Sequence, residues 1–227
     1  MNQQLIKIGQ RQVVIFSADA SSSGPIIYIH INAADAAQLV SKLAGGAAVL
    51  VAIDQVDWNH DLSPWPAKRA FRGSEDFGGG ADSYLSELTK TIVPTVEASL
   101  PFTPSIRVLA GYSLAGLFAL YAIYRTDLFN RIGSISGSLW YDGFLEFMQK
   151  NQPLRIPERV YFSLGDREKI TRNSRLAVVE DHTIQAEQHL RKLGAATIFE
   201  ENPGNHFEVA LGRLAKGLQW LTCPLTG

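Results

Sequence analysis

The stretch from residue 106 to residue 122 constrains the fold of this chain more than any other part of it. An apolar run over residues 106–110 leads into Gly-Tyr-Ser-Leu-Ala-Gly, and a second apolar run of helical length follows. This order predicts a short buried strand, a sharp turn and a buried helix. Ser113 stands at the apex of the turn, where the unpaired N–H groups of the first helical turn point toward whatever approaches its hydroxyl. The pattern is that of a nucleophile elbow.

Short apolar runs alternate with segments of helical spacing along the rest of the chain, which predicts an α/β fold with a largely parallel sheet. The first two runs are separated by a Gly-Gln turn and predict an antiparallel hairpin at the N-terminus. The predicted strands cover residues 5–8, 12–17, 26–31, 47–53, 106–110, 132–136, 159–164 and 196–200. The predicted helices cover residues 35–43, 82–100 with a kink at Pro94, the segment after the elbow, 141–150, 181–193 and 207–220.

Most of these strands end in polar or glycine-rich loops. In a parallel sheet the carboxyl ends of the strands share one edge, and ligands bind there. Only a short insertion separates the strand at residues 132–136 from the strand at residues 159–164. We therefore expect one domain over residues 1–227, without a large lid.

Composition narrows the classes of function. A formal net charge of −1 and a pI near 6.5 give no broad electrostatic reason to expect nucleic acid or an anionic membrane as a partner. Cys223 is the only cysteine, so the chain forms no internal disulfide and no thiolate metal site. The N-terminal residues lack a secretory signal pattern, and no apolar run approaches the roughly 20 residues that span a bilayer. We expect a cytoplasmic protein that needs no cofactor or metal; the oligomeric state stays open.

A serine hydroxyl is a weak nucleophile and needs a histidine base within hydrogen-bond reach. Among the five histidines, His206 alone follows the last predicted strand, on the same sheet edge as Ser113. His30 lies inside a buried strand and is better explained as a core residue, while His60 falls in a loop where a substrate contact is possible. His206 is the predicted base.

The carboxylate that orients the base is expected after the strand between the elbow and His206. Gly-Asp-Arg-Glu at residues 165–168 offers two acids. Asp166 is close to the strand end and can instead cap the following turn. Glu168 lies past that turn with a longer side chain, and it is the preferred candidate. Either choice gives the chain order serine, acid, histidine.

The long segment over residues 55–80 shows no regular periodicity but carries aromatic side chains. Loops of this length in a compact domain are commonly functional. Three aromatic residues of this segment, together with Trp140, predict an aromatic-walled pocket mouth; the three are Trp58, Trp65 and Phe71. Lys68, Arg69 and Arg72 form a basic cluster, which either is a solvated surface or favours an anionic or aromatic ester.

Four motifs together resemble the esterase D-type branch of the α/β-hydrolases, which includes S-formylglutathione hydrolases and trilactone siderophore esterases. They are residues 110–118 around Ser113, residues 134–141, residues 163–168 and residues 203–207 around His206. The resemblance implies the α/β-hydrolase fold and places the acid at Glu168. It also implies that Asp61, in Asp-Leu-Ser-Pro, borders the substrate.

The oxyanion of an acyl-transfer intermediate needs backbone donors. The N–H of Leu114 is the first, because it directly follows the nucleophile in the elbow. The resemblance places the second donor in the loop after residues 26–31, where the backbone of Asn32 or Ala33 would supply it. The sequence thus predicts a serine esterase that forms an acyl-enzyme on a small or aromatic ester. A thioesterase or acyltransferase with the same triad, or a non-catalytic acyl-binding module, is the alternative.

Overall fold

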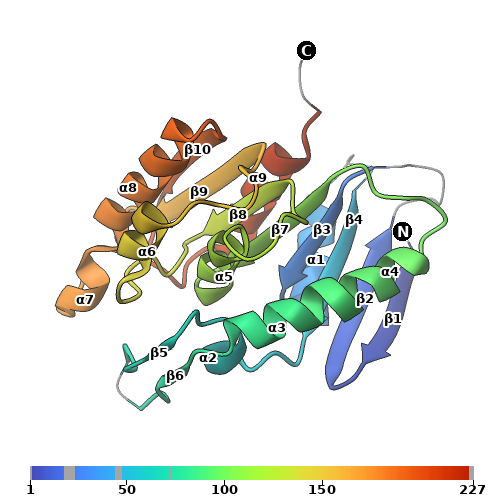
Figure 1. Ribbon diagram of the computed structural model, residues 1–227, viewed down its shortest axis with the longest axis horizontal. Coiled ribbons are helices and arrows are strands. Elements are labelled where there is room, and N and C mark those ends of the chain that lie inside the picture. The colour runs from blue at the N-terminus through green and yellow to red at the C-terminus, as the bar shows by residue number, and fades with distance from the viewer. Residues whose placement is uncertain (1, 18–23, 44–47, 72, 225–227) are drawn as a thin grey trace.

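The computed structural model describes residues 2–17, 24–43, 48–71 and 73–224. A sheet of eight strands runs through it in the order β1-β2-β4-β3-β7-β8-β9-β10 (Figure 1). Each strand that the sequence predicts is present, with ends displaced by up to three residues. The strands are β1 Asn2–Ile8, β2 Arg11–Ser17, β3 Ile26–His30, β4 Val49–Asp54, β7 Arg107–Tyr112, β8 Arg131–Ile135, β9 Arg159–Gly165 and β10 Ala196–Asn202.

Strand direction confirms the predicted mixture of a parallel sheet and an antiparallel N-terminal hairpin. β1 pairs antiparallel with β2, and β2 pairs antiparallel with β4. In the remaining part of the sheet, β4-β3-β7-β8-β9-β10, each strand runs parallel to the next one in this order. The carboxyl ends of β7, β8, β9 and β10 therefore meet at one edge, as Tyr112 pairs with Ile135 and Gly165 with Asn202.

Helices cover both faces of the sheet, and each face has its own apolar cluster. α1 (Ala33–Lys42) and α9 (Ala210–Thr222) pack on one face and contact each other. The opposite face carries α3 (Ala81–Glu87), α4 (Val93–Ala98), α5 (Leu114–Ala122), α6 (Phe144–Lys150) and α8 (Val179–Lys192). Figure 1 shows α3 and α4 in front of the sheet and α9 behind it. This is the predicted α/β-hydrolase architecture.

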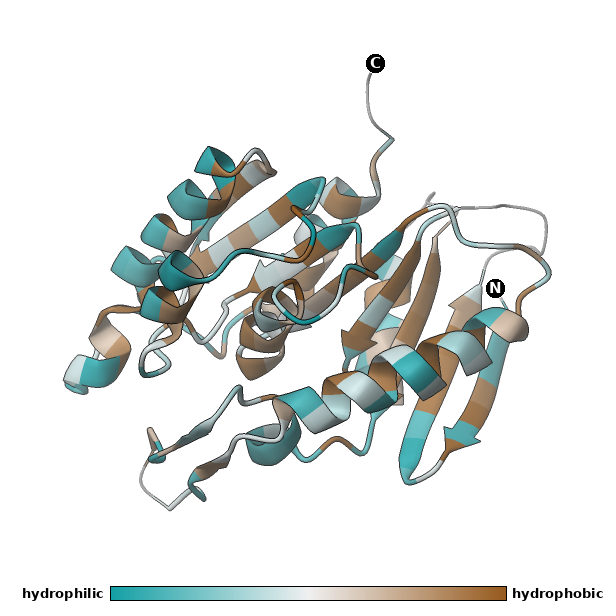
Figure 2. Ribbon diagram, viewed as in Figure 1, coloured by the Kyte–Doolittle hydropathy of each residue, from teal (hydrophilic) through white to brown (hydrophobic). Residues whose placement is uncertain are grey.

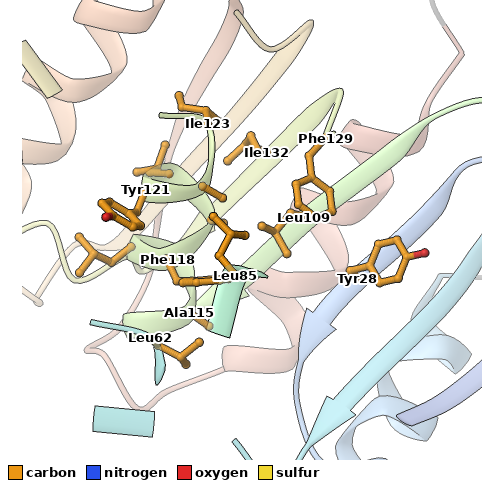
Figure 3. Close-up of a cluster of buried hydrophobic side chains, with 14 of the residues drawn as sticks. Tyr28, Leu62, Leu85, Leu109, Ala115, Phe118, Tyr121, Ile123, Phe129 and Ile132 are labelled. Atoms are coloured by element: carbon orange, nitrogen blue, oxygen red, sulfur yellow. The ribbon is translucent and has the colours of Figure 1, made fainter. Parts of the chain in front are cut away.

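The helix after the elbow is the buried centre of one face. Every residue of α5 is buried, and Figure 2 shows it brown along most of its length, while α8 alternates between brown and teal. Figure 3 shows Phe118 and Tyr121 of this helix in one apolar cluster with Leu85 of α3 and Leu109 of β7. A helix without a polar face is stable only inside a core. Because α5 is anchored there, it also fixes the position of the turn at Ser113 from which it begins.

Two predicted segments differ in the structure. Residues 55–80 contain regular elements, the short helix α2 (Trp58–Asp61) and a hairpin of β5 (Pro66–Ala67) with β6 (Phe77–Gly78). These elements are too short for periodicity to indicate them. The final helix begins at Ala210 rather than at residue 207, because Val209 has a left-handed backbone with φ 56° that interrupts helical geometry.

The expected irregularity near Pro94 is present in another form. A π-helical turn, η1 (Leu88–Ile92), joins α3 to α4, and Pro94 lies in the first turn of α4. Proline cannot donate a backbone hydrogen bond, and the first turn of a helix tolerates this. Among the residues that the structure describes, no helix is long and apolar enough to cross a membrane.

Candidate active site

Ser113 occupies a strained turn between β7 and α5. Its backbone has φ 59° and ψ −122°, a conformation that non-glycine residues rarely adopt. The turn is tight because Gly111 has no side chain; a Cβ there would lie 2.4 Å from the carbonyl carbon of Ala115. The N–H of Ser113 donates to the carbonyl of Ile135 at 3.0 Å, which ties the turn to β8. The predicted elbow is therefore present in the structure.

The structure brings together the three side chains that the sequence nominates for a triad. His206 Nε2 lies 3.0 Å from Ser113 Oγ, and His206 Nδ1 lies 2.7 Å from Glu168 Oε2. An ionised carboxylate only accepts hydrogen bonds, so the Nδ1 atom of His206 carries the ring proton. Nε2 then has a free lone pair that can accept the serine hydroxyl proton.

Glu168 is held by donors on its second oxygen. Oε1 accepts from the N–H of Gly165 at 2.7 Å, from Ser136 Oγ at 2.7 Å and from Arg213 Nη1 at 2.8 Å. Burial alone would raise the pKa of Glu168, whose side chain is 4 % exposed, but the hydrogen bonds from His206, Gly165 and Ser136, together with the charge of His206, lower that pKa below its ordinary value. The carboxylate is thus ionised at neutral pH and fixed in orientation.

Asp166, the alternative acid, has a different contact. Its Oδ1 accepts the N–H of Gly204 at 2.9 Å, and the residue is exposed. Gly204 belongs to the loop that carries His206, so Asp166 connects the loop after β9 to the loop after β10. The geometry places Glu168, and not Asp166, on the ring of His206.

Arg213 of α9 was not among the predicted site residues. Its guanidinium forms hydrogen bonds with the loops that follow β8, β9 and β10. The side chain is 1 % exposed. Besides Glu168, it donates to Ser136 Oγ at 3.0 Å through Nη1, and through Nη2 to the carbonyls of Pro203 and Asn205 at 3.1 and 3.0 Å. A signal was available, because Arg213 falls on the apolar stripe of its helix, four residues before the buried Gly217.

Replacing Arg213 by methionine is expected to lower the free energy of unfolding by about 3 kcal/mol, because the buried carboxylate of Glu168 loses its cation. Urea denaturation measures the change. The double variant R213M/E168Q leaves no buried charge and should recover at least half of the loss. If the double variant instead loses as much free energy of unfolding as the two single variants together, the ion pair between Arg213 and Glu168 does not stabilise the fold in this way.

Tyr112 also contacts His206 and helps to fix its position. Its hydroxyl donates to the carbonyl of His206 at 2.5 Å, and the two rings lie 5.3 Å apart between centroids. Arg213 Nη1 in turn lies 3.3 Å from the Tyr112 hydroxyl. The residue before the nucleophile thus helps to position the residue that would deprotonate it.

A cavity of about 520 Å³ opens at Ser113, Glu168 and His206. Trp140, predicted as a substrate contact, lines it. Trp58 and Asn32 instead line a separate cavity of about 360 Å³. Asp61 lines neither of these cavities; it pairs with Arg11 at 2.7 Å and is almost fully buried.

Of the two predicted oxyanion donors, Leu114 adjoins the serine. Leu114 is the first residue of α5, where backbone N–H groups have no partner within the helix. Asn32 caps α1 by accepting the N–H of Asp35 with its side chain at 2.9 Å. A second hydroxyl, Ser138 Oγ, lies 3.3 Å from Ser113 Oγ and was not foreseen. In the described parts of the chain, no group of three or more His, Cys, Asp or Glu has a metal-binding arrangement.

His30 is a core histidine, as the sequence predicts. It is 3 % exposed, and its Nε2 lies 2.8 Å from the Tyr84 hydroxyl. Burial, with a smaller contribution from the charge of Arg11, lowers the pKa of His30 to about 3. The ring is therefore neutral over the physiological pH range and separate from the cluster around Ser113.

Comparison with known proteins shows which family the chain is related to. Residues 9–209 match the protein family Esterase, described as "Putative esterase". The chain is also 30% identical over 181 residues to the uncharacterized protein YbbA of Bacillus subtilis (strain 168), a match that covers 76% of this chain and 72% of that protein.

Solved structures with the same fold include siderophore hydrolases. An IroE-like serine hydrolase from Shewanella oneidensis superposes with a TM-score of 0.78 at 20% identity, covering 97% of this chain and 80% of that one. The siderophore hydrolase EstA from Aspergillus nidulans superposes with a TM-score of 0.70 at 18% identity, covering 97% and 93%. The fold is thus that of α/β-hydrolase esterases, and the chain belongs to the Esterase family.

Proposed function

We propose that this protein is a serine carboxylic-ester hydrolase that works through an acyl-enzyme on Ser113. The observation that carries the proposal is the hydrogen-bonded chain from Ser113 Oγ to His206 Nε2 at 3.0 Å and from His206 Nδ1 to Glu168 at 2.7 Å. A serine held at positive φ at the end of a parallel strand, with an oriented imidazole on its hydroxyl, is arranged for attack on a carbonyl.

In the first half-reaction Ser113 Oγ bonds to the carbonyl carbon while its proton passes to His206 Nε2. The tetrahedral oxyanion accepts a hydrogen bond from the N–H of Leu114, which is worth on the order of 3 kcal/mol in the transition state. The imidazolium then gives its proton to the leaving alcohol as the carbon–oxygen bond breaks. Glu168 stays ionised and stabilises the imidazolium.

In the second half-reaction water replaces the alcohol. His206 takes a proton from the water, the hydroxide bonds to the acyl carbon, and the acid leaves as Ser113 recovers its proton. The loop after β3 stays the proposed source of the second oxyanion donor, through the backbone of Asn32 or Ala33; Asn32 caps α1 with its side chain and lines the neighbouring cavity.

The same triad also suits a thioesterase or an acyltransferase, which differ only in the leaving group or the acceptor. Mixing the protein with excess p-nitrophenyl acetate and a primary alcohol separates these functions. A hydrolase gives a burst of one p-nitrophenol per chain, followed by release of acetate with water as the main acceptor. Acyl transfer mainly to the alcohol, or a higher kcat/KM for the matching thioester, contradicts the proposal, and absence of turnover supports a binding module.

A further inference from the structure

The walls of the cavity at Ser113 are mostly apolar. Beyond the three triad residues, six apolar side chains line its volume of about 520 Å³, which suits a small organic ligand. They come from four separate parts of the chain, so no single loop explains them. They are Phe71, Trp140, Ile170, Leu176, Val179 and Phe207.

Three of these side chains are exposed at the mouth. Phe71 is 49% exposed, Ile170 72% and Phe207 83%. Single exposed apolar residues are ordinary, but three around one cavity form a patch of the kind that binds a ligand. Phe207 directly follows His206, and the two rings meet edge to face with centroids 5.2 Å apart. The apolar surface therefore extends up to the reacting atoms.

The charges around this cavity are already paired. Arg167 is the one cation among its lining residues in the described chain, and it binds Glu208 at 2.7 Å. Lys68, from the basic loop, pairs with Asp76 at 3.0 Å, and neither Lys68 nor Arg69 lines the cavity. Arg72 lies outside the described residues.

Arg175 lies beneath the aromatic wall, 5.3 Å from the centroid of the Trp140 ring, and pairs with Asp142 at 2.8 Å. It supports Trp140 through a cation–π contact. Arg175 does not line the cavity, so it presents no cation at the cavity surface to a substrate carboxylate. The basic loop thus gives no support for an anionic ester.

We infer that the substrate of this site is an ester with an uncharged, apolar or aromatic acyl group. The inference rests on the proposed function, since it assigns the acyl group attached to Ser113 in the acyl-enzyme. The acyl group stays at Ser113 through both half-reactions, so it is the part of the substrate that this cavity holds longest. Phe207 and Ile170 cover it at the mouth, and Trp140 packs against it inside.

The test measures kcat/KM for p-nitrophenyl esters with acyl chains of two, four, six and eight carbons. Each buried methylene should raise kcat/KM about threefold to fourfold until the cavity is filled. A paired comparison uses p-nitrophenyl 4-methylpentanoate and p-nitrophenyl hemisuccinate, which have nearly the same shape but differ in charge. The neutral ester should have the higher kcat/KM by at least tenfold.

The variants Phe207→Ala and Ile170→Ala should lose more kcat/KM on the hexanoyl ester than on the acetyl ester, which flattens the series. Leu5→Ala is the matched control, because Leu5 is 65% exposed on β1 and does not line this cavity; it should leave the series unchanged. A flat or falling series, or a preference for the hemisuccinate, overturns the inference. Rates that Ser113→Ala does not lower overturn the proposed function instead.

Discussion

Replacing Ser113 by alanine is expected to lower kcat for ester hydrolysis by about 10⁴- to 10⁶-fold, which is the range for loss of a triad nucleophile. The change removes the oxygen that forms the acyl-enzyme in the proposed mechanism, while His206 keeps its hydrogen bond to Glu168. The burst of p-nitrophenol should disappear together with the steady-state rate. Hydrolysis of p-nitrophenyl butyrate, corrected for the buffer reaction, measures the loss.

The fold should survive this change. Alanine keeps the Cβ of residue 113 and the same unfavourable φ of 59°, so the turn is neither relieved nor further strained. The free energy of unfolding in urea should change by less than about 1 kcal/mol. A variant that folds as well as the wild type and hydrolyses the ester within tenfold of its rate contradicts the role given to Ser113.

Glu168→Gln is expected to lower kcat by about 10³- to 10⁴-fold, while Asp166→Asn should lower it less than tenfold. Glutamine has nearly the same shape as glutamate, but it cannot hold the Nδ1 proton of His206 and stabilise the imidazolium as a carboxylate does. Asparagine at position 166 retains an oxygen that can accept the N–H of Gly204. The pair therefore compares two acids that are two residues apart with equally conservative changes.

Stopped-flow assays of both variants at pH 7.5 give the rates. Similar losses in both would mean that the loop after β9 acts as a structural unit, and a larger loss in Asp166→Asn would assign the acid to Asp166. Circular dichroism of each variant controls for unfolding, because Glu168 is buried beside Arg213 and an unpaired guanidinium is costly there.

Much of the fold was predictable, because a short stretch of sequence is enough to indicate where a strand ends and where a turn forms. The alternation of apolar runs with helical spacing identifies each strand of the sheet, and glycine with serine after the strand at residues 106–110 identifies the elbow. Because parallel strands end at one edge of a sheet, the loops that carry Ser113, Glu168 and His206 were expected to meet there. The sequence left Asp166 open because two acids two residues apart differ only in how the turn orients them.

The contacts that the sequence did not predict join distant residues. Arg213 meets Glu168 across 45 positions, and Tyr112 meets His206 across 94. The apolar stripe of α9 marks Arg213 as buried, but no local pattern names the partner in either contact, since each partner depends on how α9 and β7 are placed in the fold. Asp61 was expected beside the substrate, but it pairs with Arg11, 50 positions away, and does not line the cavity at Ser113.

Active-site labelling tests the central claim most directly. The protein is incubated with a fluorophosphonate, digested and analysed by mass spectrometry, with His206→Gln treated in parallel. We expect one label per wild-type chain, on the peptide that contains Ser113, and labelling at least 100-fold slower in His206→Gln. No label on Ser113, or labelling at the same rate without the His206 imidazole, would contradict the claim that His206 activates Ser113 as a nucleophile.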